Sequence, residues 1–521
     1  MGPAAVAVES VQDVRAWREH RLFGRSRMDA IGAQRRLLTK AGKINVPGRK
    51  SSPSPDRRPA MREEAHPLRH LAFAAVAVGA FMSTLDASVV NVALPTLAAE
   101  FDAGLGLVEW VVLSYLLVLA SLLLNMGRAA DLLGRGRIYA LGLVIFALAS
   151  AACAAAQTIP FLIGARVIQG IGGAAMNATG TAILTEVFPA SQRGRVLGWI
   201  GLAVSAGLAS GPAIGGVVLE ALSWRWIFLP NVPLAGLAAM AVVRAVPPDR
   251  RTGRERFDVP GSLLLAACLG CLSLGLSLGG HAGFASPLVL GLGAGTLALG
   301  ALFVRVELRE PAPVIDFALF RNRVFSGSAA AGFLVFVTVG AVNLVMPFYL
   351  TDALGLDTGE MGLVLTALPL ALAVAAPWSG ALADRPGTLR ALATAGAIFS
   401  TCALLVLSLV AESAGPLGIA ACLAGIGFAV GTFQSPNNSA LMGSVPRERL
   451  GTAGGLLASV RITGLLVGNA IGAAVFAAAG AAGHDGAAAA QGLHLAALAG
   501  GTAGVLAAIA SLARGRVEPL R

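Results

Sequence analysis

Long apolar runs follow one another along most of this chain, and polar residues gather in the short stretches between them. After His70 the runs do not alternate as a half-buried strand would, and each is about 18–28 residues long. A helix of this length crosses a hydrocarbon layer of about 30 Å with some tilt. Fourteen spanning segments are predicted, near residues 71–94, 108–126, 138–157, 160–185, 195–219, 226–243, 259–279, 287–304, 325–350, 361–382, 389–410, 416–440, 453–479 and 492–512.

The composition requires a lipid environment. Of the 521 residues, 56% are hydrophobic and only 13% are charged, and the mean hydropathy is +0.75. Soluble domains carry roughly 25% charged residues. Since most of the surface cannot face water, the spans must satisfy their own backbone hydrogen bonds, as helices do. The sequence therefore predicts an all-α polytopic membrane protein whose first partner is the lipid bilayer.

The loops between the predicted spans alternate in charge. Every second loop carries arginines, which include Arg128, Arg135, Arg137, Arg193, Arg195, Arg250, Arg251, Arg254, Arg256, Arg321, Arg323, Arg385, Arg390, Arg447 and Arg449. The intervening loops carry acids, namely Glu100, Asp102, Glu109, Asp352, Asp357, Glu360, Glu412 and Asp485. Arginine-rich loops stay in the cytoplasm, so both termini are predicted to be cytoplasmic and the protein to lie in the cell membrane. The net charge of +11 fits this pattern, and no nucleic-acid partner is predicted.

Residues 1–67 differ from the rest because they are polar, rich in arginine and without an apolar run long enough to bury a core. Two interpretations are open. The segment is either a disordered cytoplasmic tail that contacts anionic lipid, or an untranslated stretch ahead of a start at Met61. We favour the second, because a short basic flank suffices to orient the first span.

An internal sequence repeat indicates that the spans form two equivalent groups. The segment Gly127-Arg-Ala-Ala-Asp131-Leu-Leu-Gly134 recurs at residues 380–387 with Gly, Asp and Gly in the same register. Parallel repeats are a transporter architecture, and a charge cluster that forms in one conformation and breaks in another would act as a gate. The predicted gating residues are Gly127, Asp131, Gly134, Arg135, Asp384 and Arg385. The predicted parts are the tail 1–67, a six-helix bundle 68–247, a linker with two extra helices 248–312, a second six-helix bundle 313–513 and a C-terminus 514–521.

Several polar residues lie inside the predicted spans of the first half. Asp86 is about fifteen residues, or ~22 Å, from the cytoplasmic end of the first span. Burial favours the protonated form of a carboxylate, which suits Asp86 to carry protons; the alternative is a structural pair with Arg166 or an asparagine. Arg166 and Gln169 lie within the fourth span, where the arginine faces a partner or a cavity, or else snorkels to the interface.

Two further groups of residues are candidates for function. Gly207, Gly211, Pro212, Gly215 and Gly216 combine GxxxG spacing with a proline, which predicts a kinked fifth span pressed against another helix. The polar candidates for a pocket in the second half are Gln434, Asn437, Asn438, Asn343, Asn469 and Arg461. Arg461 is either a second intramembrane charge or, as we favour, a side chain that snorkels to the cytoplasmic face.

These segments resemble, over residues 68–513, the conserved motifs of the major facilitator superfamily. The segment Gly211-Pro212-x-x-Gly215-Gly216 is similar to the antiporter signature of its drug/proton exporters. Asp86 with Asn91 resembles the first-helix motif of the fourteen-helix, EmrB/QacA-type branch, and Trp224–Pro233 is similar to that branch as well. The first loop departs from the family at Ala129 and Leu132, where a leucine and an arginine are frequent.

The resemblance implies two six-helix bundles, alternating access and export of small lipophilic molecules in exchange for protons. Asp86, Asn91, Arg166 and Gln169 would then couple protons to substrate, with no cofactor beyond the proton gradient and with a monomer as the functional unit. A dedicated exporter of one endogenous metabolite or antibiotic fits the same residues. A P-loop is excluded after Lys50 because no lysine follows it. No metal-ligand cluster and no Ser/His/Asp grouping is evident, so an enzyme or receptor is a remote alternative.

Overall fold

The computed structural model describes residues 68–246, 258–310, 313, 315–383, 385, 387–446, 449–481 and 485–515. Within these ranges no strand occurs, and fourteen spans are long and apolar enough to cross a membrane, as predicted. The helices are α3 (Arg69–Glu100), α4 (Leu105–Val108), α5 (Trp110–Leu133), α6 (Arg135–Ala154), α7 (Ile159–Val187), α8 (Ala190–Ala221), η1 (Trp224–Ile227), α9 (Asn231–Ala245), α10 (Val259–Ala282), α11 (Pro287–Glu307), η2 (Phe317–Arg321), α12 (Arg323–Asn343), α13 (Met346–Asp352), α14 (Thr358–Ala383), α15 (Thr388–Val410), α16 (Pro416–Gly443), α17 (Leu450–Ala478) and α18 (Gly486–Ala513).

Local sequence explains where several helices begin. Thr158 accepts a hydrogen bond from the backbone N–H of Phe161 at the start of α7. Asn322 likewise accepts from the N–H groups of Val324 and Phe325 at the start of α12. Side chains of this type satisfy backbone donors that have no partner in the first turn of a helix. These caps set the ends of the spans within the longer apolar runs.

Two predicted segments differ in detail from the structure. The segment 325–350 is divided into α12 and α13, because the regular helix ends at Asn343 and Pro347 begins a new first turn. Glu109 does not lie in an exposed outer loop. It occupies the turn between α4 and α5 and is 1% exposed, because α4 extends the second span beyond its predicted start.

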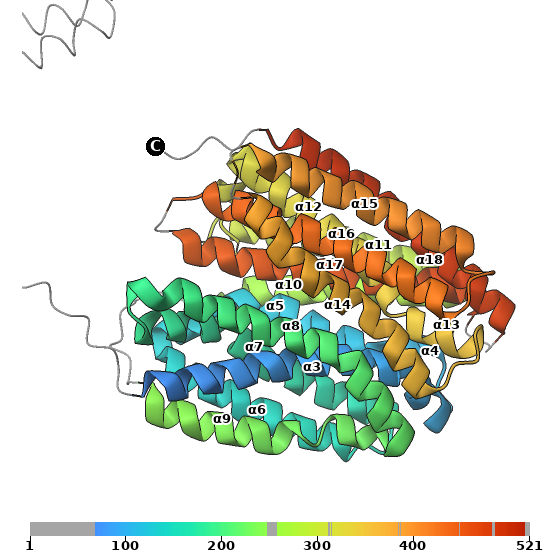
Figure 1. Cartoon of the computed structure of the whole chain (residues 1–521), viewed down its shortest axis with the longest axis horizontal. Coiled ribbons are helices and arrows are strands. Elements are labelled where there is room, and N and C mark those ends of the chain that lie inside the picture. Colours follow the sequence, from blue (N-terminus) through green and yellow to red (C-terminus); the bar gives the residue numbers. More distant parts are fainter. Residues whose placement is uncertain are drawn as a thin grey trace, which may run out of the picture. The chain divides into compact units, whose positions relative to one another are not determined.

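The first six spans pack mainly against one another, and so do the last six (Figure 1). Contacts between the two bundles join α8 to α14, α5 to α17 and α3 to α13. The extra helix α10 packs against both α5 and α17, and α11 packs against α10. These contacts are those of a fourteen-helix fold with two six-helix bundles and a linking pair. The residue boundaries of these parts stay predictions, and the tail 1–67 lies outside the described residues.

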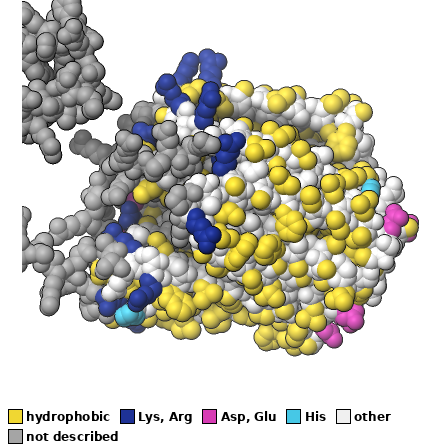
Figure 2. Space-filling model, turned by 45° about the horizontal axis from the view of Figure 1, so that its top comes forward, with side chains coloured by type: hydrophobic (Ala, Val, Ile, Leu, Met, Phe, Trp, Pro, Cys, Tyr) yellow, Lys and Arg dark blue, Asp and Glu magenta, His cyan; other side chains and the backbone are white. Residues whose placement is uncertain are grey.

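Charge and hydrophobicity are separated on the surface. Figure 2 shows hydrophobic side chains across the middle of one face, with arginines gathered at one end and acidic side chains at the other. Several large apolar side chains are strongly exposed, among them Leu148 at 68%, Leu297 at 77% and Leu409 at 78%. Exposed apolar surface of this extent matches the lipid-facing band of a membrane protein.

Candidate functional site

Two ionisable side chains meet in the interior of the first bundle. Asp86 on α3 and Arg166 on α7 are each 1% exposed. The Nη1 atom of Arg166 lies 2.5 Å from Oδ2 of Asp86, which makes a charge-assisted hydrogen bond. The structure therefore brings together two predicted site residues that are 80 positions apart in the sequence. It also excludes the interpretation that Arg166 snorkels to the interface.

A network of amides and a hydroxyl completes the surroundings of Asp86. Its Oδ1 accepts hydrogen bonds from Nε2 of Gln169 at 2.9 Å and from Nδ2 of Asn231 at 3.2 Å. The Gln169 amide also donates to the Ser150 hydroxyl at 2.9 Å. Because buried polar groups are tolerated when their hydrogen-bonding capacity is filled, this network satisfies the acceptor oxygens of the buried carboxyl group.

The guanidinium of Arg166 is equally well supported. Its Nε donates to the carbonyl oxygen of Val111 at 2.9 Å, and its Nη1 also donates to Oε1 of Gln169 at 2.6 Å. The Cζ atom lies 4.3 Å from the centre of the Tyr115 ring, a cation–π contact. Removal of either charge would leave the other one buried without a counter-ion, which is strongly destabilising.

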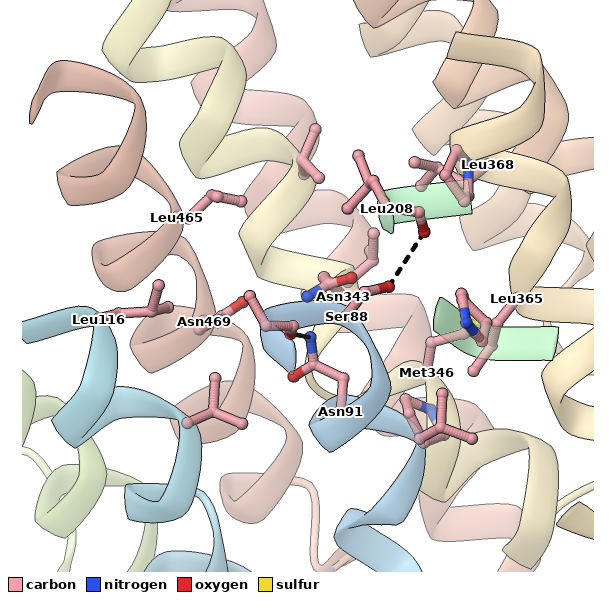
Figure 3. A pocket seen from close by; sticks show the side chains of 18 of the residues that line it. Ser88, Asn91, Leu116, Leu208, Asn343, Met346, Leu365, Leu368, Leu465 and Asn469 are labelled. Carbon is pink, nitrogen blue, oxygen red and sulfur yellow. Dashed lines mark hydrogen bonds between the residues drawn. The ribbon is translucent and has the colours of Figure 1, made fainter. Parts of the chain in front are cut away.

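A cavity of about 160 Å³ lies between the two bundles, and Arg166 forms part of its wall. The wall is mostly apolar, with residues of α3, α5, α7 and α8 on one side and of α12, α13, α14, α16 and α17 on the other. Asn91, Asn343 and Asn469 are its asparagines (Figure 3). Apolar walls with a few placed polar groups are typical of sites for small molecules.

Asn91 belongs to this central cavity and makes no bond to Asp86. Its amide Nδ2 donates to the carbonyl of Ala87 at 3.3 Å, while Asp86 itself is absent from the cavity wall. Among the described residues, neither Oδ1 of Asn91 nor Oδ1 of Asn469 has a hydrogen-bond partner. Unpartnered buried acceptors are rare, and in a cavity wall they are available to water or to the donors of a ligand.

The predicted antiporter segment packs tightly against two helices. A Cβ added to Gly211 would lie 2.5 Å from the Cβ of Ser88, and one added to Gly215 would lie 2.8 Å from Val89, both on α3. Gly207 also faces α3, where an added Cβ would meet Thr84. Gly216 faces α14 instead, with the Thr358 carbonyl 2.5 Å from the added atom. Pro212 lies inside α8 and in the wall of the central cavity.

The predicted gating loop carries an exposed ion pair. Nη2 of Arg135 lies 2.9 Å from Oδ1 of Asp131, and Nη1 of Arg135 lies 3.7 Å from Oε2 of Glu186. Gly134 has a φ of +103°, which suits a glycine. In the second copy Gly387 also has a positive φ, +83°, but its ψ is −5° whereas that of Gly134 is 126°, so the repeated glycines share the sign of φ and not the full conformation. Gly127 is helical, Arg385 lies in a bend, and Asp384 falls outside the described residues.

Four of the six residues proposed for a second-half pocket line one small cavity, and the other two, Asn343 and Asn469, line the central one. Gln434, Asn437 and Asn438 on α16 and Arg461 on α17 border a cavity of about 20 Å³. Arg461 therefore lines a cavity between helices and is of intermediate exposure, so both interpretations of this residue stay predictions. The helix α12 supplies the remaining side of this cavity.

Fourteen spans arranged as two bundles around a shared cavity define a membrane transporter. The sequence pattern of the Major Facilitator Superfamily matches residues 76–469 and 328–520, and the chain belongs to this family. A bacterial homologue of the human lysosomal transporter Spinster, in an inward-facing and unoccupied conformation, shares the fold with a TM-score of 0.58. The likeness covers 86% of this chain and 97% of that one at 15% identity.

Two relatives indicate the branch of the superfamily to which the chain belongs. The riboflavin transporter RibZ of Clostridioides difficile is 34% identical over 403 residues, which are 77% of this chain and 87% of RibZ. The multidrug resistance protein Stp of Mycobacterium tuberculosis is 33% identical over 414 residues, which are 78% of this chain and 76% of Stp. Relatives named for drug resistance place the chain in the drug-exporter branch of the superfamily.

Sequence reasoning missed part of the site. It did not identify Ser150, Tyr115 or Asn231 as partners of the ion pair, although Asn231 belongs to the segment Trp224–Pro233 that had been noted for its resemblance. It also treated Asp86 as the acidic residue well inside a span, whereas Glu109 is buried within the second span as well. An asparagine directly after a proline, at the start of a span, was the available signal for Asn231.

Proposed function

We propose that this protein exports small lipophilic molecules in exchange for protons, with its two bundles alternately opening the central cavity to either side of the membrane. The observation that carries the proposal is the position of Arg166, which both pairs with the buried Asp86 and lines the central cavity. Protonation of Asp86 would remove the counter-ion of Arg166 and change the charge of the cavity wall. Proton binding and substrate binding would thereby influence each other through one side chain.

Close packing along α8 supports alternating access. Gly216 near the end of α8 presses against Thr358 and Gly362 at the start of α14. Near the other end of α8, a Cβ added to Gly194, Gly198 or Gly201 meets no atom of another described helix within 4 Å. The alternation of loop charges assigns the tightly packed end to the outside and the termini to the cytoplasm. Opening toward the outside would require α8 and α14 to separate at these glycines.

The other predicted roles are part of the same proposal. Asn91 and Gln169 serve substrate binding and proton coupling, and the ion pair of Arg135 with Asp131 serves the cytoplasmic gate. A monomer in the cell membrane, driven by the proton gradient alone, would suffice, since the central cavity is formed by one chain. Neither a cofactor nor a nucleic acid enters this proposal.

The test is uptake by inside-out vesicles energised with an acidic interior, using a panel of lipophilic cations, amphipathic carboxylates, neutral antibiotics and riboflavin. Wild-type protein should accumulate at least one compound, and Asp86→Asn, compared at an equal amount of folded protein, should reduce that uptake by at least tenfold, because this variant cannot release a proton. Asp102→Asn is the matched control, since Asp102 is exposed in the turn after α3 and asparagine tolerates its φ of +47°. Gradient-driven uptake that survives Asp86→Asn would exclude Asp86 as the coupling residue.

A second candidate is a dedicated exporter of a single compound. It is favoured by the relative RibZ, whose name assigns it one vitamin, riboflavin. The same vesicle panel separates the two candidates. Uptake of several unrelated compounds supports a multidrug exporter, whereas uptake of riboflavin alone supports the dedicated one.

A further inference from the structure

The small second cavity lies between α12, α16 and α17, and it shares Phe336 with the wall of the central cavity. Its lining is polar on one side, where Ser328 joins the amides of α16. The loop charges assign the start of α12, the end of α16 and the start of α17 to the cytoplasm. The small cavity is therefore on the cytoplasmic side of the central cavity, along the path that an exported molecule would follow.

Arg461 is the charged residue of this cavity. It lies about eleven residues into α17, or ~16 Å along the helix axis from its start. Within the part of the chain that the structure describes, its guanidinium has no ion pair and no hydrogen bond. A charged side chain inside a span is costly and almost always faces a partner or a cavity. Arg461 faces the cavity, and no described residue supplies the partner.

A second arginine adds positive charge beside the cavity. Arg514, 1% exposed, donates to Oδ1 of Asn437 at 3.1 Å and to the Ser328 hydroxyl at 3.3 Å. Burial lowers the pKa of Arg514 to about 10, which leaves it charged at neutral pH. The Asn437 amide is in turn held by the Ser328 carbonyl at 3.0 Å. Neither cavity wall contains an acidic residue among those described, so the surroundings favour a negative ligand.

We propose that Arg461, with the amides of Gln434 and Asn438, binds the anionic group of an amphipathic organic substrate whose apolar body occupies the central cavity. This inference rests on the proposed export function and names its substrate class. A guanidinium matches the two oxygens of a carboxylate. A volume of about 20 Å³ holds little more than one water-sized group, so a carboxylate fits better than the larger phosphate of a lipid headgroup.

The test is equilibrium binding to the purified full chain in detergent at pH 7.5, with 2-naphthoate and its neutral isostere 2-naphthamide as probes. Wild type should bind naphthoate at least tenfold more tightly than naphthamide. Arg461→Gln should weaken naphthoate binding by about ten- to a hundredfold, the range expected for a lost hydrogen bond to a charged group, and leave naphthamide binding intact. Unchanged naphthamide binding shows that the variant is folded.

Two further variants sharpen the result. Arg461→Lys should retain part of the preference for naphthoate, because it keeps the positive charge but loses the paired donors of the guanidinium. Arg323→Gln removes an exposed arginine at the cytoplasmic start of α12 and should leave both affinities unchanged. Equal affinity of wild type for the two probes, or naphthoate binding that survives Arg461→Gln, would overturn the proposal. Displacement of naphthoate by short-chain phosphatidylglycerol but not by benzoate would assign the site to lipid and overturn it as well.

The binding assay needs no proton gradient, so it is independent of the vesicle experiment. Tighter binding of naphthoate than of naphthamide, together with uptake that does not depend on the proton gradient, would support the anion site and contradict proton antiport. Gradient-driven uptake, together with equal binding of the two probes, would support proton antiport and contradict the anion site.

Discussion

The two bundles each place an arginine inside the membrane, and they treat its charge in opposite ways. Arg166 in the first bundle has a carboxylate at 2.5 Å, an amide, a backbone carbonyl and an aromatic ring around it. Arg461 in the second bundle has none of these among the described residues and faces a cavity instead. The charge of Arg166 is balanced by a carboxylate of the protein, whereas the charge of Arg461 is available to a molecule that enters the cavity.

The difference shows that the role of an intramembrane arginine depends on whether it is paired with an acidic residue. A buried pair is tolerated because the attraction between the two charges offsets the cost of removing them from water. When one partner gains a proton, the other loses its counter-ion. An unpaired guanidinium beside a cavity must be stabilised by water or by a ligand. Charge alone therefore does not reveal the role of an intramembrane arginine; its partners do.

The largest expected effect concerns stability. Arg166→Gln leaves Asp86 buried without a counter-ion and should lower the free energy of unfolding by about 3–5 kcal/mol. Arg461→Gln removes a charge that has no partner among the described residues, and it should change the free energy of unfolding by less than about 1 kcal/mol. Thermal unfolding in detergent, followed by tryptophan fluorescence, checks both. Equal melting temperatures for the two variants would show that the ion pair is not the structural element we describe.

A smaller effect should follow from giving Arg461 a partner. Gln434→Glu places a carboxylate of nearly the same shape in the wall of the small cavity and makes it resemble the first bundle. The added charge should compete with an anionic ligand and weaken 2-naphthoate binding by about tenfold, with little effect on 2-naphthamide. The Gln434→Asn variant, tested in the same binding assay, controls for altered shape. An unchanged affinity for naphthoate would contradict a shared site.

The smallest expected effect concerns a feature of both bundles, a glycine with positive φ in the repeated loop. Gly134→Ala and Gly387→Ala each place a side chain on a backbone with positive φ and should each cost about 1–2 kcal/mol of stability. Gly127→Ala is the control, because Gly127 is helical and an added Cβ meets no atom within 4 Å. That variant should be neutral or slightly stabilising. Unfolding of the three variants in detergent compares them, and equal stabilities would contradict a requirement for glycine at the two positions with positive φ.

Most of the fold was predictable because a lipid environment leaves few choices. Apolar runs of spanning length gave fourteen helices, and the arginine-rich loops and the repeated glycine–aspartate register pointed to two bundles. The candidate residues Asp86 and Arg166 were predictable too, since charges inside spans are rare and costly. The break before α13 and the burial of Glu109 were not, because hydropathy does not record where a helix ends or which face it buries.

The sequence by itself determined the class of protein, the number of spans and the identity of the polar residues that lie inside them. Only the tertiary structure decided which of these residues meet. It paired Asp86 with Arg166, placed Asn91 in the cavity wall without a bond to Asp86, and placed Arg461 in a cavity whose described lining contains no carboxylate. The physical reason is that insertion into lipid depends on summed hydrophobicity along one helix, whereas pairing depends on how several helices are rotated and packed against each other.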